Sequence, residues 1–341
     1  MDIIRTSDRQ YFKRCRVLWD FTSKIRQDYE PIQRIEALDF GTAMHKALEA
    51  YYQPATWQSD DKIANARQAF LEAIKDVQTK VRIGALEFET RFNELKELGL
   101  GMLDNYFMWA PNHDSFKPVL VEIEFEVPIP GLDDVVYQGR IDLVVEDDYG
   151  YWLVDHKTTA QFAQTEWLAL DDQCSSYAWA IREQLGLEVR GVIYNELYKK
   201  VPHAPRRLAR GGFSVAKNQD TSFEVYLAEL RKEGYHGKYL RPYLPMLQFL
   251  KENPKQFVRR TKVTYRPQTL IIVEDRIRKE AMEMLNAPAI YPTPSRFNCN
   301  GCSFFAPCVA LHEGSDPDSI LDELYERRGS VPVSQGLSRA T

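Results

Sequence analysis

The sequence lacks any apolar run of membrane-spanning length, and its first residues show no signal-peptide pattern. These absences argue against a membrane-spanning or secreted protein, and we expect a cytoplasmic location, in a bacterium or in a phage-infected host. The sequence also lacks the phosphate-binding motif G-x-x-x-x-G-K-S/T, which excludes a P-loop motor in this chain. With 44% hydrophobic and 27% charged residues among 341, the composition is that of an ordinary globular protein.

Cysteine is scarce, and no excess of positive charge is present. Five cysteines are an odd number, which without a secretion signal argues against a disulfide framework. The formal net charge of −5 does not favour a nucleic-acid partner. It does not exclude one either, because a local basic groove can bind phosphate on an acidic protein.

The clearest pattern is a pair of stretches rich in β-branched and aromatic residues, 138–145 and 151–159, around turn-like residues 147–150. This pattern predicts a β-hairpin. With the turn at 147–150, Asp142 lies opposite Asp155, and their Cβ atoms are roughly 4.5–5.5 Å apart.

The predicted hairpin places charges in an apolar setting. Lys157 extends from the same face as Asp155, because side chains alternate along a strand. Opposed carboxylates repel, and a hard divalent cation such as Mg²⁺ would remove that repulsion. The alternative is a solvated hairpin with the ion pairs Asp142–Arg140 and Asp155–Lys157, but apolar residues on both faces argue against it. The sequence therefore predicts a metal site with a lysine beside it.

The periodicity of the flanking segments predicts a mixed α/β fold. A helix at 40–52 and a strand at 119–127 precede the hairpin, and a helix at 173–182 and a strand at 191–198 follow it. These elements form an α-β-β-β-α-β core whose first three strands are an antiparallel meander. Further helices are predicted from Thr6 or Ser7 through Cys15 to Phe21, twice within 60–109, and at 221–234, 270–285 and 318–327.

Three residues carry weak signals when taken alone. His45 shares a helix face with Glu49 and Tyr52, but a lone helical histidine is more often a packing residue than a ligand. Cys15 by itself is best explained as a small buried apolar residue. Glutamates 122, 124 and 126 share one face of the strand at 119–127; one of them could reach the metal site, whereas a solvated face explains at least two of the three.

A basic region follows the predicted core. It is either a solvated insertion or a basic edge that holds a phosphate backbone. Its cations cluster around Gly211 and Gly212 and recur later: Lys199, Lys200, Arg206, Arg207, Arg210, Lys217, Arg259, Arg260 and Lys262.

The motifs acquire more weight as an ordered set. Gly41-x-x-x-His45, Gly139-Arg140-Ile141-Asp142, Val154-Asp155-His156-Lys157 and Gln173-x-x-x-Tyr177 follow one another along the chain. In this order they resemble the PD-(D/E)XK nuclease superfamily, and most closely its RecB-like branch. That branch includes CRISPR-associated adaptation nucleases and phage exonucleases.

The resemblance implies a ligand set for a catalytic metal. His45, Asp142, Asp155 and the backbone carbonyl of His156 would hold Mg²⁺ or Mn²⁺. Lys157 would orient the attacking water or help to deprotonate it, and would offset charge on the reacting phosphate. The metal would lower the pKa of that water and stabilise the developing negative charge.

The resemblance also implies roles for the helix after the hairpin. Gln173 and Tyr177 would join Asp142, Asp155 and Lys157 as catalytic residues that position the substrate or the site. The implied fold is a restriction-endonuclease-like core with a helical N-terminal lobe. Glu122, in the strand before the hairpin, matches the strand-borne glutamate of the family only loosely and would support the site.

The cysteines form a second signature. Cys15, followed by C-x2-C-x5-C at Cys299, Cys302 and Cys308, resembles the iron–sulfur clasp of several of these nucleases. Four thiolates suffice for a [4Fe–4S] cluster, although a Cys₄ set also suits Zn²⁺. The resemblance favours iron, and either group would tie the two ends of the chain together. Cys174 lies outside this set and is predicted to be a packing residue.

We expect six segments along the chain. They are an N-terminal helix with the first cluster cysteine (1–37), a helical lobe (38–117), the nuclease core (118–200), a basic and helical insertion (201–285), the cysteine cluster region (286–328) and a disordered tail (329–341).

The expected activity is that of a metal-dependent DNA exonuclease in recombination, repair or phage DNA processing. Its expected substrate is DNA, as single strands or duplex ends, and a recombination or replication protein is an expected partner. Two alternatives stay open: a structure-specific endonuclease, and a DNA-binding assembly subunit with a vestigial nuclease site. A metal-storage or redox protein would leave the hairpin and Gln173–Tyr177 unexplained.

Overall fold

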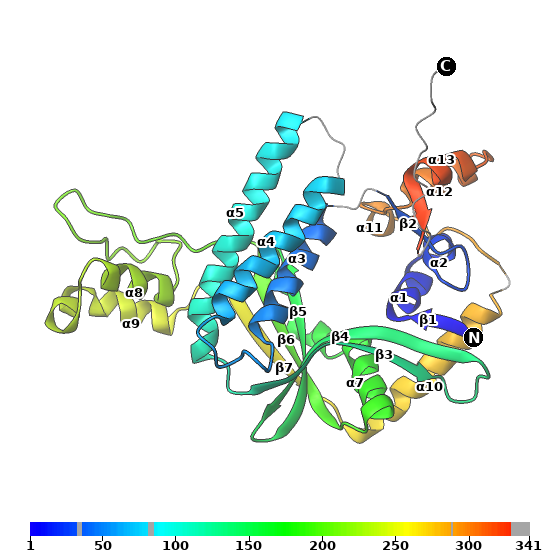
Figure 1. Cartoon of the computed structure of the whole chain (residues 1–341), viewed down its shortest axis with the longest axis horizontal. Coiled ribbons are helices and arrows are strands. Elements are labelled where there is room, and N and C mark those ends of the chain that lie inside the picture. Colours follow the sequence, from blue (N-terminus) through cyan, green and yellow to red (C-terminus); the bar gives the residue numbers. More distant parts are fainter. Residues whose placement is uncertain (33–35, 81–84, 288, 329–341) are drawn as a thin grey trace, which may run out of the picture. The chain divides into compact units, whose positions relative to one another are not determined.

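The computed structural model describes residues 1–32, 36–80, 85–287 and 289–328 (Figure 1). The tail predicted to be disordered, 329–341, lies outside these residues. The chain divides into two compact units. Unit 1 comprises Met1–Ile35, Phe125–Gly139 and Glu274–Thr341, and unit 2 comprises Glu36–Glu124 and Arg140–Val273. Every predicted nuclease residue belongs to unit 2 and every predicted cluster cysteine to unit 1, while the six-segment division stays a prediction.

Unit 2 is built on a mixed sheet with the strand order β4-β5-β6-β7. In the β4–β5 hairpin, Leu143 pairs with Val154 and Asp147 with Gly150, which is the predicted register. Strand β6 runs parallel to β5 and antiparallel to β7, and β3 pairs with β4. The strands span β3 (Lys117–Pro128), β4 (Val135–Asp147), β5 (Gly150–Thr159), β6 (Val189–Tyr198) and β7 (Val258–Thr264).

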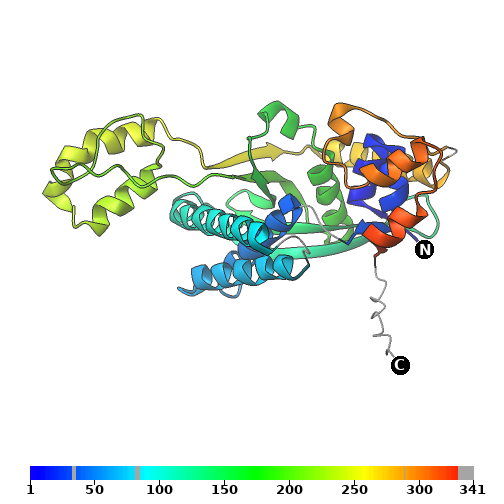
Figure 2. The same ribbon diagram turned by 90° about the horizontal axis from the view of Figure 1, so that it is seen from above.

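Helices cover both faces of this sheet (Figure 2). On one face, α3 (Glu36–Tyr51), α4 (Lys62–Lys80) and α5 (Ala85–Trp109) form a hydrophobic core with Leu143, Val145, Trp152 and Val154 of the hairpin. On the other face lies α7 (Asp172–Leu185), which follows the short α6 (Thr165–Leu168).

The order α3-β3-β4-β5-α7-β6 confirms the predicted α-β-β-β-α-β core and its restriction-endonuclease-like fold class. Because Val144 and Leu153 on the α7 face are buried as well, the hairpin has no solvated face.

The segment between β6 and β7 forms a small helical lobe within unit 2. It contains α8 (Phe223–Lys232), the 3₁₀ helix η2 (Gly237–Tyr243) and α9 (Leu244–Glu252). Ser222 caps α8, because its hydroxyl accepts a hydrogen bond from the Val225 N–H. The lobe has its own small hydrophobic core, which includes Tyr226, Leu230 and Leu247.

In unit 1, the predicted helix from Thr6 to Phe21 is wrong as a single element. Cys15 is extended, with φ −163° and ψ 123°, and it separates α1 (Thr6–Arg14) from α2 (Arg16–Thr22). The break has a consequence for packing. Phe12 and Trp19 would lie about 10 Å apart along one straight helix, but their ring centroids are 4.8 Å apart. The periodicity of apolar residues predicted the two helical segments and gave no sign of the break.

The remaining elements of unit 1 surround these helices. Strand β1 (Asp2–Arg5) runs parallel to the first residues of β4, and β2 (Tyr29–Pro31) is antiparallel to β8 (Tyr325–Arg327). The helices that follow the sheet are α10 (Pro267–Leu285), which begins in unit 2, α11 (Arg296–Cys299), α12 (Phe305–His312) and α13 (Asp318–Leu324). No helix among the described residues is both long and apolar enough to cross a membrane.

The predicted strict alternation along β3 fails at Glu122. Phe125 and Val127 are buried as predicted, but on the other side of Glu122 the buried residues are Phe116 and Pro118, at even positions. Glu122 has a positive φ of 48°, which is a strained backbone for a residue with a side chain. The strict alternation therefore holds only for the end of the strand, because residues 119–123 are all partly buried.

Candidate metal centre and active site

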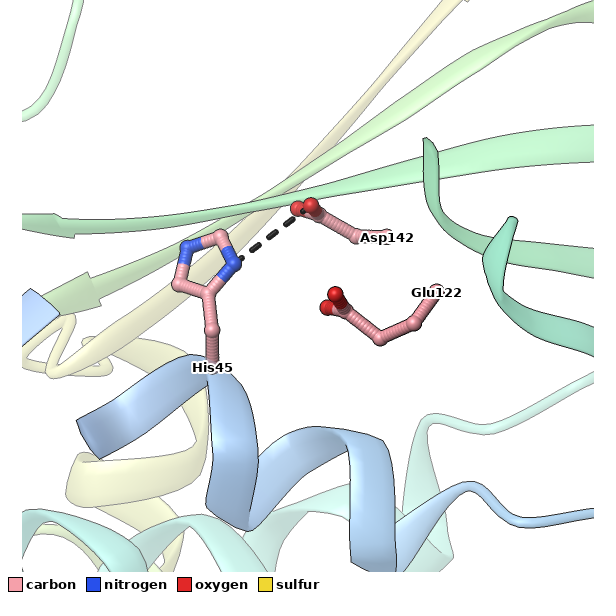
Figure 3. A group of neighbouring side chains, drawn as sticks. All are labelled: His45, Glu122 and Asp142. Carbon is pink, nitrogen blue, oxygen red and sulfur yellow. Dashed lines mark ion pairs between the residues drawn. The ribbon is translucent and has the colours of Figure 1, made fainter. Parts of the chain in front are cut away.

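Three side chains from three elements converge next to the hairpin (Figure 3). His45 comes from α3, Glu122 from β3 and Asp142 from β4, and one ligand atom of each lies within 4.8 Å of the other two. His45 Nδ1 is 3.4 Å from Asp142 Oδ1. Arg140 Nε is 2.8 Å from Glu122 Oε2 and holds this carboxylate in place. One imidazole and two carboxylates are a donor set that suits a divalent cation.

Asp142 lies one residue beyond the pair Leu143–Val154, which is the last pair of the hairpin ladder. Its Oδ2 accepts a hydrogen bond of 2.8 Å from the backbone N–H of His156, so this carboxylate reaches the D-x-K segment of β5. Burial alone would raise the pKa of Asp142, but hydrogen bonding and charge from His45 lower it to about 2. The pKa of His45 is raised, since the attraction of Asp142 outweighs the effect of burial. The pair is thus held together electrostatically.

Asp155 and Lys157 lie on the same face of β5, as their spacing predicted. Lys157 Nζ donates a hydrogen bond of 3.0 Å to Asp155 Oδ1. Burial raises the pKa of Asp155 to about 6, although the charge of Lys157 acts against this rise. The second oxygen, Oδ2, is buried and has no hydrogen-bond partner among the described residues. A carboxylate oxygen left in this way is costly, and a bound cation would satisfy it.

The predicted positioning residues Gln173 and Tyr177 lie at the beginning of α7, which packs against β5 and β6. Asp171 caps the helix, and its Oδ1 accepts hydrogen bonds from the N–H groups of Gln173 and Cys174. Gln173 Nε2 donates to the Tyr177 hydroxyl over 2.8 Å, in line with their i, i+4 spacing. Cys174 is fully buried, in keeping with its predicted packing role.

The predicted ligand set fits this arrangement in part. His45 and Asp142 are together, and Glu122, matched only loosely in the sequence, completes the tight group. Asp155 is nearby but outside that group, and its Oδ2 supplies a further free oxygen. The imidazole of His156 is hydrogen-bonded to Asn195. The ligand role of the His156 backbone carbonyl stays a prediction.

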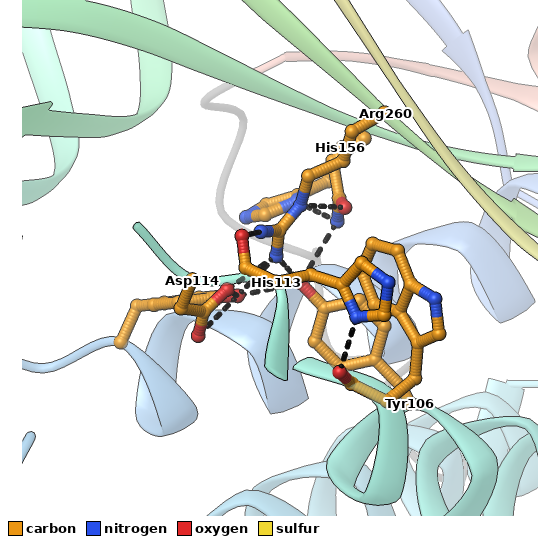
Figure 4. Close-up of polar contacts among 8 residues, drawn as sticks. Tyr106, His113, Asp114, His156 and Arg260 are labelled. Carbon is orange, nitrogen blue, oxygen red and sulfur yellow. Dashed lines mark hydrogen bonds and ion pairs between the residues drawn. The ribbon is translucent and has the colours of Figure 1, made fainter. Parts of the chain in front are cut away.

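A buried polar network lies behind His156 (Figure 4). His156, Asn195 and Arg260 are register partners on β5, β6 and β7. Arg260 Nε donates to Asn195 Oδ1 over 3.0 Å, and Asn195 Nδ2 lies 2.9 Å from His156 Nδ1. Since the Asn195 oxygen is engaged by Arg260, its NH₂ group donates to His156. Burial lowers the pKa of His156 to about 3, which agrees with an imidazole that accepts at Nδ1.

Arg260 is the centre of this network. It forms an ion pair of 2.6 Å with Asp114 and donates to the hydroxyls of Tyr52 and Tyr106. The sequence pattern missed this role, because it grouped Arg260 with exposed basic residues. A lone arginine on a strand gives no local sign of its burial.

The predicted basic edge is neutralised in part by acidic partners. Arg207 pairs with Glu233, Lys200 with Asp220, Arg259 with Glu196 and Lys262 with Asp147. Several of the cations that sequence reasoning assigned to a phosphate backbone therefore have local structural partners.

The four predicted cluster cysteines all belong to unit 1. Burial raises the pKa values of the Cys302 and Cys308 thiols, and the other cysteines of the set contribute to the rise. Cys15, Cys302 and Cys308 border one hydrophobic cluster. Among the described residues, no three of these thiols lie within 4.8 Å of one another.

Comparison with known families agrees with this geometry. The family model described as the PD-(D/E)XK nuclease superfamily matches residues 6–309, which is most of the chain. The chain belongs to the PD-(D/E)XK nuclease superfamily. A comparison with curated proteins gives no match. Nucleases of this superfamily use divalent metal ions, and His45, Glu122 and Asp142 are a group whose ligand atoms lie close enough together to hold one.

Proposed function

We propose that this PD-(D/E)XK nuclease is a divalent-metal-dependent DNA exonuclease of the RecB-like branch. It hydrolyses phosphodiester bonds in single strands or at duplex ends, in recombination, repair or phage DNA processing. The observation that carries the proposal is the convergence of His45, Glu122 and Asp142 beside the Asp155–Lys157 pair. This convergence is the arrangement expected of a site that holds a cation against a phosphate.

The residues of the site divide into two groups by chemistry. His45, Glu122, Asp142 and Asp155 would hold Mg²⁺ or Mn²⁺, since oxygen and imidazole donors suit these ions. When bound, the metal supplies a water of lowered pKa and stabilises charge on the phosphate oxygens.

The second group of residues acts on the substrate. Lys157, with 43% of its side chain exposed, is placed to donate to the phosphate and to orient the attacking water. Gln173 and Tyr177 position the scissile strand from α7, and their mutual hydrogen bond fixes the side chain of each.

A cleavage assay tests this proposal. End-labelled linear, circular and single-stranded DNA are incubated with the anaerobically purified protein in Mg²⁺, Mn²⁺ or EDTA. We expect metal-dependent loss of label from linear substrates and no cutting of circles, because an exonuclease needs an end. Cutting of circular DNA would replace the proposal with a structure-specific endonuclease. Binding without cleavage in either metal would leave a DNA-binding subunit with a vestigial site.

We also propose that Cys15, Cys299, Cys302 and Cys308 hold a [4Fe–4S] cluster. The proposal rests on four free thiols in unit 1 and on their C-x2-C-x5-C spacing. Cys15 is the one extended residue between α1 and α2, so the helix break presents this cysteine at the start of α2. A cluster here would join the N-terminal helices to the segment that contains α11 and α12.

Replacing Cys302 with alanine should therefore remove iron from the protein. We expect loss of brown colour, loss of iron in elemental analysis and a lower melting temperature, because a bound metal group stabilises the folded state. Cys174→Ala is the matched control, since this cysteine belongs to unit 2, and it should retain iron. Zinc in place of iron in anaerobic wild-type protein, or full iron in the Cys302→Ala variant, would contradict the proposal.

A further inference from the structure

A second feature of unit 2 is a cleft of about 690 Å³ between the end of α5, the α8–α9 lobe and the first residues of β7. Its charge is strongly one-sided. Five cations line it, and Glu224 is its single acidic lining residue. The cations are Arg231, Lys251, Lys255, Arg259 and Arg260.

Two of these cations, Arg231 and Lys251, are available to a ligand, whereas the other three are paired. Arg259 is paired with Glu196, Arg260 with Asp114 and Lys255 with Asp220. Arg231 of α8 and Lys251 of α9 are exposed, and no ion pair in the described part of the chain involves either one. An anionic ligand in the cleft would therefore meet these two side chains without breaking an existing ion pair.

The cleft also has an aromatic wall. The ring of His113 stacks on Trp109, with centroids 3.9 Å apart and planes inclined by 11°. His113 Nδ1 lies 2.7 Å from the backbone carbonyl of Trp109, which fixes the imidazole in this position. The Arg260 guanidinium lies 4.9 Å from the centroid of the Trp109 ring. His113 is exposed, so it offers a planar face, held in place from behind, to a ligand in the cleft.

The cleft lies close to the metal-binding strand. Arg260 forms part of its wall and is hydrogen-bonded to Asn195, which is hydrogen-bonded to His156. His156 lies between Asp155 and Lys157 on β5. On the opposite face of the sheet, Arg259 of the cleft wall is paired with Glu196, which is the register partner of Lys157.

We infer that this cleft binds one strand of DNA next to the bond that is cut. Its cations would contact phosphates, and His113 would stack on a base. A cationic groove combined with aromatic faces is the usual combination for single-stranded nucleic acid, because every base has a face that can stack. A space of this size accommodates a few nucleotides of one strand. The inference rests on the proposed nuclease function and adds to it the form of the substrate.

The test uses the full chain and a short fluorescein-labelled oligothymidine, with binding measured by fluorescence anisotropy in Ca²⁺ to prevent cleavage. The cleft variant is Arg231→Ala with Lys251→Ala. The control is Lys238→Ala with Arg241→Ala, which removes two exposed cations from the same lobe outside the cleft. We expect the cleft variant to bind roughly tenfold more weakly. The slope of the logarithm of the binding constant against the logarithm of the salt concentration should fall in magnitude by about 1.4, because each phosphate contact in a single strand contributes about 0.7 to this slope. The control should remain within about twofold of wild type.

A second variant tests the stacking. His113→Ala should weaken binding roughly fivefold or more, in line with the stacking energy of one base. It should have little effect on an oligonucleotide with abasic sites, in which no base is present to stack. Equal losses on both oligonucleotides would show that His113 acts only on the shape of the cleft, and would overturn the stacking claim.

Hydrolysis of bis(p-nitrophenyl) phosphate separates the cleft from the metal site. This small phosphodiester needs only the metal site, so the cleft variant should hydrolyse it like wild type. Wild-type affinity for the oligothymidine in the cleft variant, with hydrolysis intact, would overturn the cleft and leave the nuclease proposal standing. Loss of oligothymidine binding in the cleft variant, with no hydrolysis by the wild-type protein, would support the cleft as a binding site and contradict the nuclease proposal.

Discussion

Replacing Asp155 with asparagine should lower the rate of metal-dependent DNA cleavage by about 1,000-fold or more and leave the fold intact. A catalytic metal ion contributes several kcal/mol to transition-state stabilisation, and each 1.4 kcal/mol corresponds to a factor of ten. Asp155 is 4% exposed, and its free Oδ2 is the oxygen that a cation would occupy. Asparagine keeps the shape of the side chain but removes its charge.

Thermal unfolding with and without Mn²⁺ separates this effect from misfolding. Because a ligand that binds only the folded state stabilises it, Mn²⁺ should raise the melting temperature of wild type and have a much smaller effect on Asp155→Asn. In metal-free buffer the variant should melt no lower than wild type, since a buried carboxylate near Asp142 has been neutralised. Asp148→Asn, in the exposed hairpin turn, is the matched control and should behave as wild type. Cleavage by Asp155→Asn at the wild-type rate would remove Asp155 from the active site.

Replacing Arg260 with methionine should reduce the free energy of unfolding by about 3–5 kcal/mol. Breaking a buried ion pair by removing one partner leaves the other charge uncompensated, and losses of this size are typical. The side chains of Arg260 and Asp114 are 11% and 3% exposed. The variant also loses the hydrogen bonds to Tyr52 and Tyr106. Urea denaturation followed by circular dichroism measures the loss.

The origin of this destabilisation can be checked in two ways. Burial already raises the pKa of Asp114. An acid whose pKa is raised in the folded state destabilises the fold above that pKa, so the loss in Arg260→Met should be smaller in mildly acidic than in alkaline buffer. Adding Asp114→Leu should recover most of the loss, because replacing a whole buried pair with apolar residues is often neutral.

Arg67→Met is the control for the Arg260 experiment. Its pair with Asp104 is about half exposed, so its loss should stay below about 1 kcal/mol. A similar small loss in Arg260→Met would show that the network contributes little to stability.

Much of the site could be read from local sequence patterns. The alternation of β-branched residues and the turn at 147–150 predicted the hairpin register, and the pairing of Leu143 with Val154 confirms it. The i, i+4 spacing of Gln173 and Tyr177 likewise indicates one shared helix face, and the structure joins the two side chains by a hydrogen bond. Such predictions succeed because they depend on repeats of two and of 3.6 residues, which the chain fixes over short distances.

Other features had no such local signal. The alternating glutamates of β3 left open which of them reaches the site, and it is Glu122, a residue with positive φ, that lies with His45 and Asp142. Cys15 was predicted within a continuous helix and is instead the extended residue between two helices. Arg260 was counted with surface cations and is buried among tyrosines.

The sequence by itself therefore determined the order of the core elements, the hairpin register and the identity of the D-x-K residues. Only the tertiary structure decided which glutamate joins the metal group, where the N-terminal helix breaks and which arginine supports His156. These features depend on contacts between residues far apart in the chain, such as Glu122 with His45 and Arg260 with Asp114. Energies from such contacts override local propensity, and no short-range period in the sequence records them.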